Sequence, residues 1–196
     1  MRELSLVTAT RPISSLSKSS TFRKRNLLFE SCTDDQQSSI TGAATLANAM
    51  VEHANKELNA PTVKKVHSRY QTWFGHYEQL RHHIVKKHFL SLSGQATTFT
   101  YDCGTCPSKF GSSNAWMYAY VQTHPDTGKE MYLCEEFWKR PRHNADSKPA
   151  LLVNALSRFP EYGGTTDYYI TPTEVEKLAA HNPEGAIQNA ENYKRL

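Results

Sequence analysis

The sequence predicts an α+β fold, in which helices pack on a small, mostly antiparallel sheet. Three observations predict it: helical periodicity over residues 33–58 and 62–92, short strand-like segments within 97–136, and helix-start signals in the last quarter of the chain. The 196 residues suit one domain, and 38% hydrophobic with 21% charged residues is typical of a globular chain. We expect this domain over residues 29–196, preceded by a flexible tail or pro-segment remnant over residues 1–28.

The first third of the chain carries helix signals. A strand-like run over residues 26–29 comes first. Residues 33–36 then form a capping box, in which the threonine hydroxyl and the glutamine side chain satisfy free backbone N–H groups. We expect a helix from there to about Leu58, an interruption at Pro61, and a second helical region from 62 to 92.

Four histidines lie between residues 76 and 88 of the second helical region, and histidine often binds metals. His82 and His83 are adjacent, so they point to different faces of a helix. The surrounding segment is also rich in lysine and arginine. We therefore expect a solvated or core-edge role for all four: His76, His82, His83 and His88.

Short strands are expected in the middle of the chain. They cover residues 97–102, 115–122 and 131–134, and a turn at 123–129 separates the last two. These segments supply the small sheet of the predicted fold.

The last quarter of the chain returns to helices. Pro149 opens a helix at a position that proline tolerates, and Pro160 ends it. After a glycine-rich loop, one helix is expected over residues 173–180. Another begins at Asn182, where an N-cap is followed by proline and an acidic residue.

Charge and hydropathy argue against two classes of partner. The net charge of +4 and the pI near 8.8 are mildly basic, and the basic residues form no obvious stripe, so we expect no nucleic acid. No segment approaches the roughly 18 apolar residues of a membrane span. Residues 1–18 lack the apolar stretch of a signal peptide. A transit peptide is conceivable, but we favour a pro-segment remnant or a chain that begins after a removed signal.

Four cysteines permit two disulfides with three possible connectivities. Cys103 and Cys106 form a CxxC pair, which also occurs in zinc knuckles and redox sites. Cys32 and Cys134 are too scattered for a compact second ligand pair, and Pro107 does not fit the redox context. We therefore expect structural disulfides, which are typical of a secreted protein, although the chain has no glycosylation sequon.

Several segments in collinear order, together covering about residues 29–194, resemble one enzyme family. Each segment alone is a weak signal, but the ordered set is specific. The chain resembles the aspzincin (deuterolysin-like) metallopeptidases, and most closely the fungal peptidyl-lysine metalloendopeptidases. The matching segments are Ser31-Cys32-Thr33, residues 69–75, Arg81-His82, Tyr132-Leu133-Cys134, Phe137-Trp138-Lys139, the Gly163-Gly164-Thr165-Thr166-Asp167-Tyr168 motif and residues 182–193.

The resemblance implies a zincin-like α+β fold with disulfides Cys32–Cys103 and Cys106–Cys134. In such enzymes, a helix carries His-Glu-x-x-His, in which the two histidines hold zinc and the glutamate activates water. The third ligand is an aspartate of the following loop. A tyrosine three residues after that aspartate helps to stabilise the transition state. The resemblance places these roles on Asn154, Ala155, Arg158, Asp167 and Ile170.

Of these positions, only Asp167 keeps its family residue. Asn154 offers a neutral amide, which is a poor zinc ligand beside imidazole. Ala155 has no proton acceptor, so no general base remains, and Arg158 places a permanent cation at a ligand position. A zinc site with four good ligands is worth on the order of 10–16 kcal/mol, which one carboxylate cannot supply. We therefore expect zinc to be lost. His143 is a conceivable substitute ligand, but it precedes the helix and matches no family position.

The lysine-recognition site is also altered. In lysine-specific members, two acids on the last helix receive the substrate ammonium, and the resemblance places them on Glu191 and Lys194. These two residues have the i,i+3 spacing at which a helix allows them to pair with each other. We expect them, with Tyr168 and Tyr169, to line the inherited cleft as binding residues.

Loss of zinc would leave Asp167 as a carboxylate in need of a partner. We expect the Arg158 guanidinium to pair with it, and Asn154 to add a hydrogen bond. In the alternative, Arg158 extends into solvent and Asp167 caps a nearby turn.

The leading functional hypothesis is a secreted, monomeric pseudoprotease that binds a protein or peptide through the inherited cleft, as an effector, decoy or inhibitor. The alternative is an active zinc metalloendopeptidase with a rearranged site. Two further classes remain open. One is a different enzyme that reuses the cleft, for example with His82, Asp102 or Tyr168, and the other is a structural or storage protein.

Overall fold

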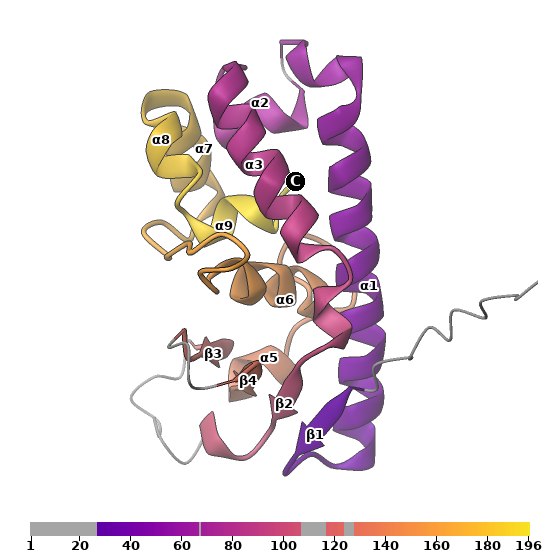
Figure 1. Cartoon of the computed structure of the whole chain (residues 1–196). Coiled ribbons are helices and arrows are strands. Elements are labelled where there is room, and N and C mark those ends of the chain that lie inside the picture. Colours follow the sequence, from indigo (N-terminus) through magenta and orange to yellow (C-terminus); the bar gives the residue numbers. More distant parts are fainter. Residues whose placement is uncertain (1–26, 67, 107–116, 124–127) are drawn as a thin grey trace, which may run out of the picture.

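The computed structural model describes residues 27–196, except 67, 107–116 and 124–127. One long helix, α1 (Asp34–Asn59), extends along one side of the whole molecule (Figure 1). Most of the other helices gather beside its C-terminal half, whereas the sheet and the short helix α5 (Glu135–Trp138) lie beside its N-terminal half. Between them lies α6 (Lys148–Ser157), which crosses the middle of the molecule. Residues 1–26 of the expected tail lie outside the described residues.

The sheet has four short strands in the order β1-β2-β4-β3: β1 (Leu28–Glu30), β2 (Thr100–Asp102), β3 (Ala119–Val121) and β4 (Glu130–Leu133). The strands β1 and β2 are parallel, as are β2 and β4, and only β3 runs antiparallel to β4. The expectation of a mostly antiparallel sheet was therefore wrong. Helices α1, α2 (Arg69–Phe74) and α3 (Gln79–Leu92) connect β1 to β2, and such a long helical crossover is the connection that parallel strands require.

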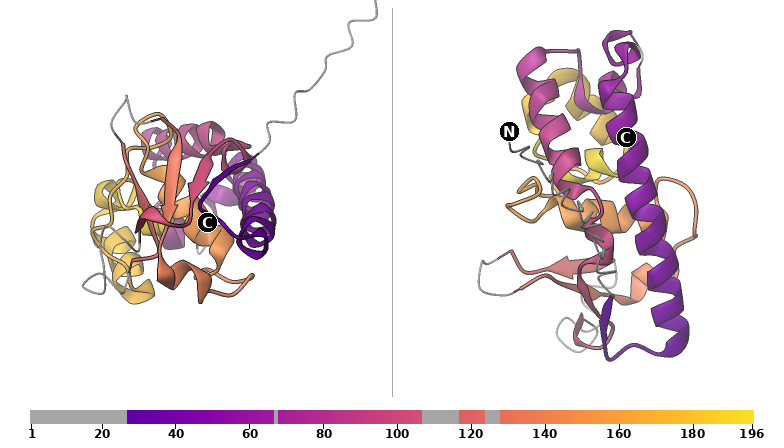
Figure 2. Two further views of the ribbon diagram at one scale, coloured as in Figure 1. Left: turned by 90° about the horizontal axis from the view of Figure 1, so that it is seen from below. Right: turned by 45° about the vertical axis from the view of Figure 1, so that its right-hand side comes forward.

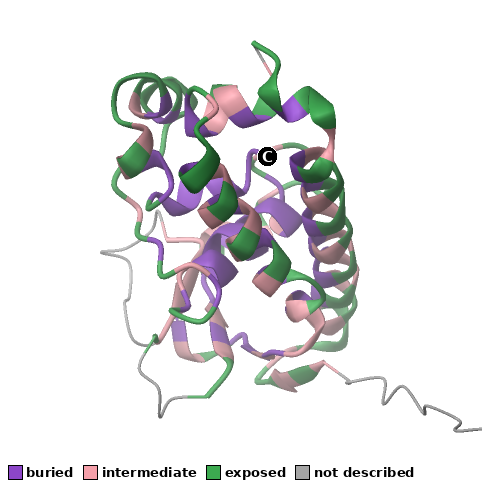
Figure 3. Ribbon diagram, turned by 45° about the horizontal axis from the view of Figure 1, so that its top comes forward, coloured by how far each residue is buried: buried purple, intermediate pink, exposed green. Residues whose placement is uncertain are grey.

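The long helix α1 begins at the expected capping box. Thr33 Oγ1 accepts a hydrogen bond from the Gln36 amide at 3.3 Å, and Gln36 Oε1 accepts one from the Thr33 amide at 2.9 Å. Small and branched apolar residues form its buried stripe: Ile40, Ala43, Ala44, Ala47, Val51, Ala54 and Leu58. These small side chains allow close approach of α3 and α6, and the outer face of α1 remains exposed (Figure 3).

The second helical region is divided, contrary to the single pattern expected over residues 62–92. It contains the 3₁₀ turn η1 (Pro61–Lys64) and the helices α2 (Arg69–Phe74) and α3 (Gln79–Leu92). Gly75 ends α2 with φ of 78°, in the left-handed region that favours glycine. A Cβ at this position would lie 2.5 Å from the Ala179 carbonyl oxygen. The break therefore lets α2 pack closely against the C-terminal helices.

The four histidines between residues 76 and 88 take the expected places at the surface and core edge. His76 and His83 are exposed. His82 Nε2 lies 2.9 Å from the Leu58 carbonyl oxygen, and His88 Nδ1 lies 2.6 Å from the Tyr193 hydroxyl. Burial lowers the pKa of both His82 and His88.

The remaining elements are short. A 3₁₀ turn η2 (Gln95–Thr97) precedes β2, and α5 (Glu135–Trp138) follows β4. The chain ends in α7 (Pro172–His181), α8 (Pro183–Ala186) and α9 (Ala190–Tyr193). The helix expected from Asn182 does begin there, since Asn182 Oδ1 accepts the Gly185 amide at 3.0 Å. It is interrupted between α8 and α9.

Two disulfides close the sheet end of the molecule, and both have the expected pairing. Cys32 bonds to Cys103, which joins the start of α1 to the end of β2, and Cys106 bonds to Cys134. Figure 2 shows this end from below, where the strands lie beside the first turns of α1. Among the described residues, no helix is both long and apolar enough to cross a lipid bilayer.

Candidate functional site

The candidate site is built on α6. Ser147 caps this helix through a hydrogen bond from the Ala150 amide to its Oγ, and Pro149 occupies the first turn. Every residue from Pro149 to Ser157 is buried. Asn154 is only 6% exposed, and Arg158 ends the helix with helical backbone angles. Positions 154 and 158 therefore lie one turn apart on one face.

The loop after α6 brings Asp167 to this face. Gly164 has φ of 61°, which the tight turn requires. The Thr165 amide donates to the Ser157 carbonyl oxygen at 3.1 Å, and the two side-chain hydroxyls lie 2.7 Å apart. These bonds fix the loop to the end of α6.

Asn189, in the break between α8 and α9, holds the other side of the loop. Its Oδ1 accepts hydrogen bonds from the Tyr168 amide at 2.8 Å and the Tyr169 amide at 3.2 Å. Its Nδ2 donates to the Tyr169 carbonyl oxygen at 3.1 Å. Sequence reasoning missed this residue, because an asparagine in a helical segment carries no local signal for a contact about 20 residues away.

Asp167 is paired as expected. The Arg158 guanidinium forms an ion pair with Asp167 Oδ2, and Asn154 Nδ2 donates to Asp167 Oδ1 at 3.2 Å. Arg158 also donates to Asn154 Oδ1, from Nη2 at 3.0 Å and from Nε at 3.3 Å. The side chains of Arg158 and Asp167 are 28% and 26% exposed. The alternative, in which Arg158 extends into solvent and Asp167 caps a nearby turn, is wrong.

The contacts continue from Asn154 into a buried charge cluster. Asn154 Nδ2 lies 3.4 Å from Glu191 Oε2, and the other Glu191 oxygen binds Lys194 Nζ at 2.8 Å and Arg195 Nη2 at 2.6 Å. Lys194 Nζ also lies 2.9 Å from Asp146 Oδ1. The expected Glu191–Lys194 pair is therefore present, with two partners that sequence reasoning missed. The i,i+4 spacing of Glu191 and Arg195 was a usable signal for one of them.

Burial and charge act in opposite directions in this cluster. Burial raises the pKa of Glu191, and the Lys194 ammonium and Arg195 guanidinium oppose that effect. Burial also acts to raise the pKa of Asp146, but the hydrogen bond and charge of Lys194 hold it below its ordinary value. Lys194 is 5% exposed, and its ammonium already has two carboxylate partners, Asp146 and Glu191.

Other candidate residues lie outside this cluster. Ile170, Tyr168 and Tyr169 are exposed by 61%, 60% and 44%. Asp102 accepts hydrogen bonds from the Gly104 and Thr105 amides and the Thr105 hydroxyl, at 2.7–2.8 Å. Burial acts to raise the pKa of Asp102, but these bonds hold it below its ordinary value. Asp102 thus stabilises the turn between the two disulfides.

The groups around Asp167 do not fit a zinc ion. Its neighbours are a neutral amide and a permanent guanidinium cation, whereas zinc sites use imidazole, thiolate or carboxylate ligands. Ala155, next to Asn154, offers no donor atom. In the described part of the chain, no group of three or more histidine, cysteine, aspartate or glutamate residues is arranged to hold a metal.

Comparison with known proteins identifies the family of this chain. A family model described as lysine-specific metallo-endopeptidase matches residues 59–195. The chain belongs to this family. A solved zinc peptidase from Grifola frondosa superposes on the family member described here with a TM-score of 0.73 and 32% identity, covering 83% of this chain and 94% of that one.

Two curated members of the lysine-specific metallo-endopeptidase family are similar over most of the chain. The peptidyl-Lys metalloendopeptidase of Grifola frondosa is 33% identical over 171 residues, which cover 87% of this chain and 46% of that protein. That of Pleurotus ostreatus is 32% identical over 167 residues, which cover 85% and 93%. The chain thus spans about half the length of the first relative and nearly all of the second.

Proposed function

We propose that this chain is a catalytically inactive member of the lysine-specific metallo-endopeptidase family, which holds no zinc and acts by binding a protein or peptide partner. One observation carries the proposal: the Arg158 guanidinium and the Asn154 amide occupy both oxygens of Asp167. A cation bonded to the carboxylate repels a metal ion from the same position.

The chemistry of zinc-dependent hydrolysis also supports a loss of catalytic activity. Hydrolysis by a zinc peptidase needs a group that removes a proton from the attacking water. Ala155 has no such group, and it is 3% exposed within a helix that is buried throughout. Ile170 has no hydroxyl to stabilise an oxyanion.

Recognition of a substrate lysine is also proposed to be lost. The Lys194 ammonium lies 2.8 Å from Glu191 and 2.9 Å from Asp146, and Arg195 binds the same Glu191 oxygen. A substrate ammonium would have to displace these two cations and desolvate its own charge. The internal lysine therefore supplies the charge that a substrate would otherwise bring.

An exposed apolar segment supports partner binding. Tyr168, Tyr169 and Ile170 are consecutive, exposed and held by the bonds of Asn189 to the loop backbone. Tyrosine is enriched in protein interfaces, and a rigid segment loses little conformational entropy on binding. Two disulfides support a secreted location. In this proposal the chain itself acts as an effector, decoy or inhibitor, and the partner is its target.

Metal analysis and a cleavage assay test the loss of activity. The purified chain, incubated with zinc and dialysed, is expected to retain none and to leave lysine-containing peptides intact. About one equivalent of zinc per chain with chelator-sensitive cleavage would establish the alternative, an active endopeptidase with a rearranged site. The Pleurotus ostreatus enzyme serves as the positive control.

Affinity capture from extracellular medium tests the binding role. A Tyr168→Ser, Tyr169→Ser variant should lose the captured partner. The control, Leu90→Ser, removes another exposed apolar side chain (54%) on α3 and should keep it. Equal capture by both variants would contradict the assignment of the binding surface.

A further inference from the structure

A hollow lies at the other end of the contacts that begin at Asp167, where Lys194 and Arg195 are. It is a pocket of about 490 Å³ between the middle of α1, the loop over residues 142–149 and the C-terminal turn. Its wall carries basic side chains from four separate parts of the chain and, among the described residues, no acidic one. The basic lining residues are His53, Arg69, Arg142, His143, Lys194 and Arg195.

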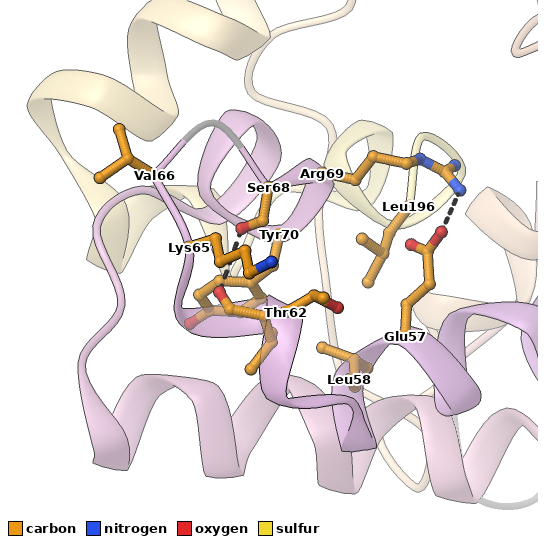
Figure 4. A pocket seen from close by; sticks show the side chains of 10 residues that line it. Glu57, Leu58, Thr62, Lys65, Val66, Ser68, Arg69, Tyr70 and Leu196 are labelled. Atoms are coloured by element: carbon orange, nitrogen blue, oxygen red, sulfur yellow. Dashed lines mark hydrogen bonds and ion pairs between the residues drawn. The ribbon is translucent and has the colours of Figure 1, made fainter.

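The charges around this basic pocket do not cancel. Three carboxylates lie next to the pocket without lining it, and each is already bonded to lining residues: Glu57 to Arg69 and His53, and both Asp146 and Glu191 to Lys194 and Arg195. The wall thus carries four permanent cations against three carboxylates, so one positive charge is in excess even with both histidines neutral. The carboxylates also hold Arg69, Lys194 and Arg195 in place. Figure 4 shows the Arg69–Glu57 pair beside a neighbouring pocket.

Arg142 is the permanent cation of this wall that has no ion pair within the described part of the chain. Its guanidinium lies on α1 at Gly42, where a Cβ would come within 3.4 Å of Nη2. A larger residue at position 42 would therefore crowd the guanidinium. The absence of a side chain on α1 at this point leaves Arg142 room to lie beside the pocket with its donors free.

The loop that carries Arg142 is held at both ends. The Lys148 amide donates to the Pro141 carbonyl oxygen at 2.9 Å, and Lys148 Nζ lies 3.3 Å from Ser39 Oγ on α1. Inside the loop, the Asp146 amide donates to Asn144 Oδ1 at 2.8 Å. The backbone that carries Arg142 and His143 is therefore fixed before any ligand arrives, which reduces the entropy cost of binding.

Arg195 is held in this wall by its neighbours. It is 8% exposed and lines the pocket, its Nη2 lies 2.6 Å from Glu191 Oε1, and its guanidinium lies over the Trp73 ring. Its Nε is buried and does not face the pocket.

We propose that this basic pocket binds an oxyanion, the phosphate or sulfate group of a small ligand. Guanidinium groups match the geometry of such oxygens through paired N–H donors, and excess positive charge favours a multiply charged anion. The proposal does not rest on the loss of peptidase activity, because Arg142 and His143 belong to neither the Asp167 cluster nor the exposed loop.

Binding is tested with two probes, inorganic tripolyphosphate and a sulfated disaccharide, by calorimetry at low ionic strength and by amide NMR shifts. We expect saturable binding of at least one probe with a dissociation constant below about 1 mM, and shifts concentrated on residues 142–148. The probe that binds more tightly shows whether the pocket prefers phosphate or sulfate groups.

A matched pair of variants separates the pocket from net charge. Arg142→Gln should weaken binding about tenfold, since a charge-assisted bidentate contact is lost. Lys177→Gln removes the same charge from an exposed position on α7 and should leave binding unchanged. Both side chains are exposed, so both variants should fold, which circular dichroism checks. No binding of either probe, or equal weakening in both variants, would overturn the proposal.

Discussion

Arg158→Met removes the guanidinium that binds Asp167 and keeps most of the aliphatic stem. Exposed ion pairs contribute about 0–1 kcal/mol, and loss of one partner from a buried pair costs about 3–5 kcal/mol. The two side chains here are 28% and 26% exposed, between those limits. We therefore expect a coupling energy of about 2 kcal/mol between Arg158 and Asp167.

A double-mutant cycle with Asp167→Asn, followed by urea unfolding, measures this coupling. The control is the Lys139–Glu136 pair, whose atoms lie 2.7 Å apart but whose side chains are 57% and 20% exposed. That pair should couple less strongly. A coupling below about 0.5 kcal/mol for Arg158 and Asp167, or one no larger than the control's, would refute the view that an internal cation stabilises Asp167.

Three further outcomes are expected. Lys194→Met should cost about 3 kcal/mol in urea unfolding, more than Arg158→Met, because the lysine is 4% exposed between two carboxylates; a smaller cost would contradict the role of burial. Asp102→Asn should reduce the loss of unfolding free energy at acid pH. The pKa of Asp102 in the folded protein lies below 3.8, so its charge stabilises the fold above pH 3.8, and this contribution is lost as the pH falls through the folded pKa. An unchanged dependence of the unfolding free energy on pH would contradict this. Combined Asn154→His, Ala155→Glu and Arg158→His should bind about one zinc per chain by metal analysis, and a folded variant without zinc would show that these positions do not converge as ligands.

Local signals predicted the helices and the chemistry of the altered helix. The capping box at residues 33–36 and the prolines at 149 and 183 act within one turn, so their effect can be read from neighbouring residues. The unsuitability of Asn154 and Arg158 as zinc ligands is likewise a property of the side chains themselves. The proposed pairing of Arg158 with Asp167 needed the spacing of a helix and its following loop, together with the family resemblance.

Strand direction and helix breaks depended on more distant contacts. The parallel pairing of β1 with β2 follows from a crossover of about 70 residues, whereas short apolar runs carry no signal for direction. Similarly, the break at Gly75 is explained by the approach of Ala179, more than 100 residues later. Local periodicity continues across that glycine, so it predicted an uninterrupted helical region.

The residue types at Asn154, Ala155 and Arg158 follow directly from the sequence, and so does the chemistry that they lack. The partners of the charged groups come from packing: Asp146 joins Lys194, and His53, Arg69, Arg142 and Arg195 reach one pocket from four parts of the chain. Electrostatic energy depends on distance in space and on burial, and neither is encoded in the spacing of residues far apart in the chain.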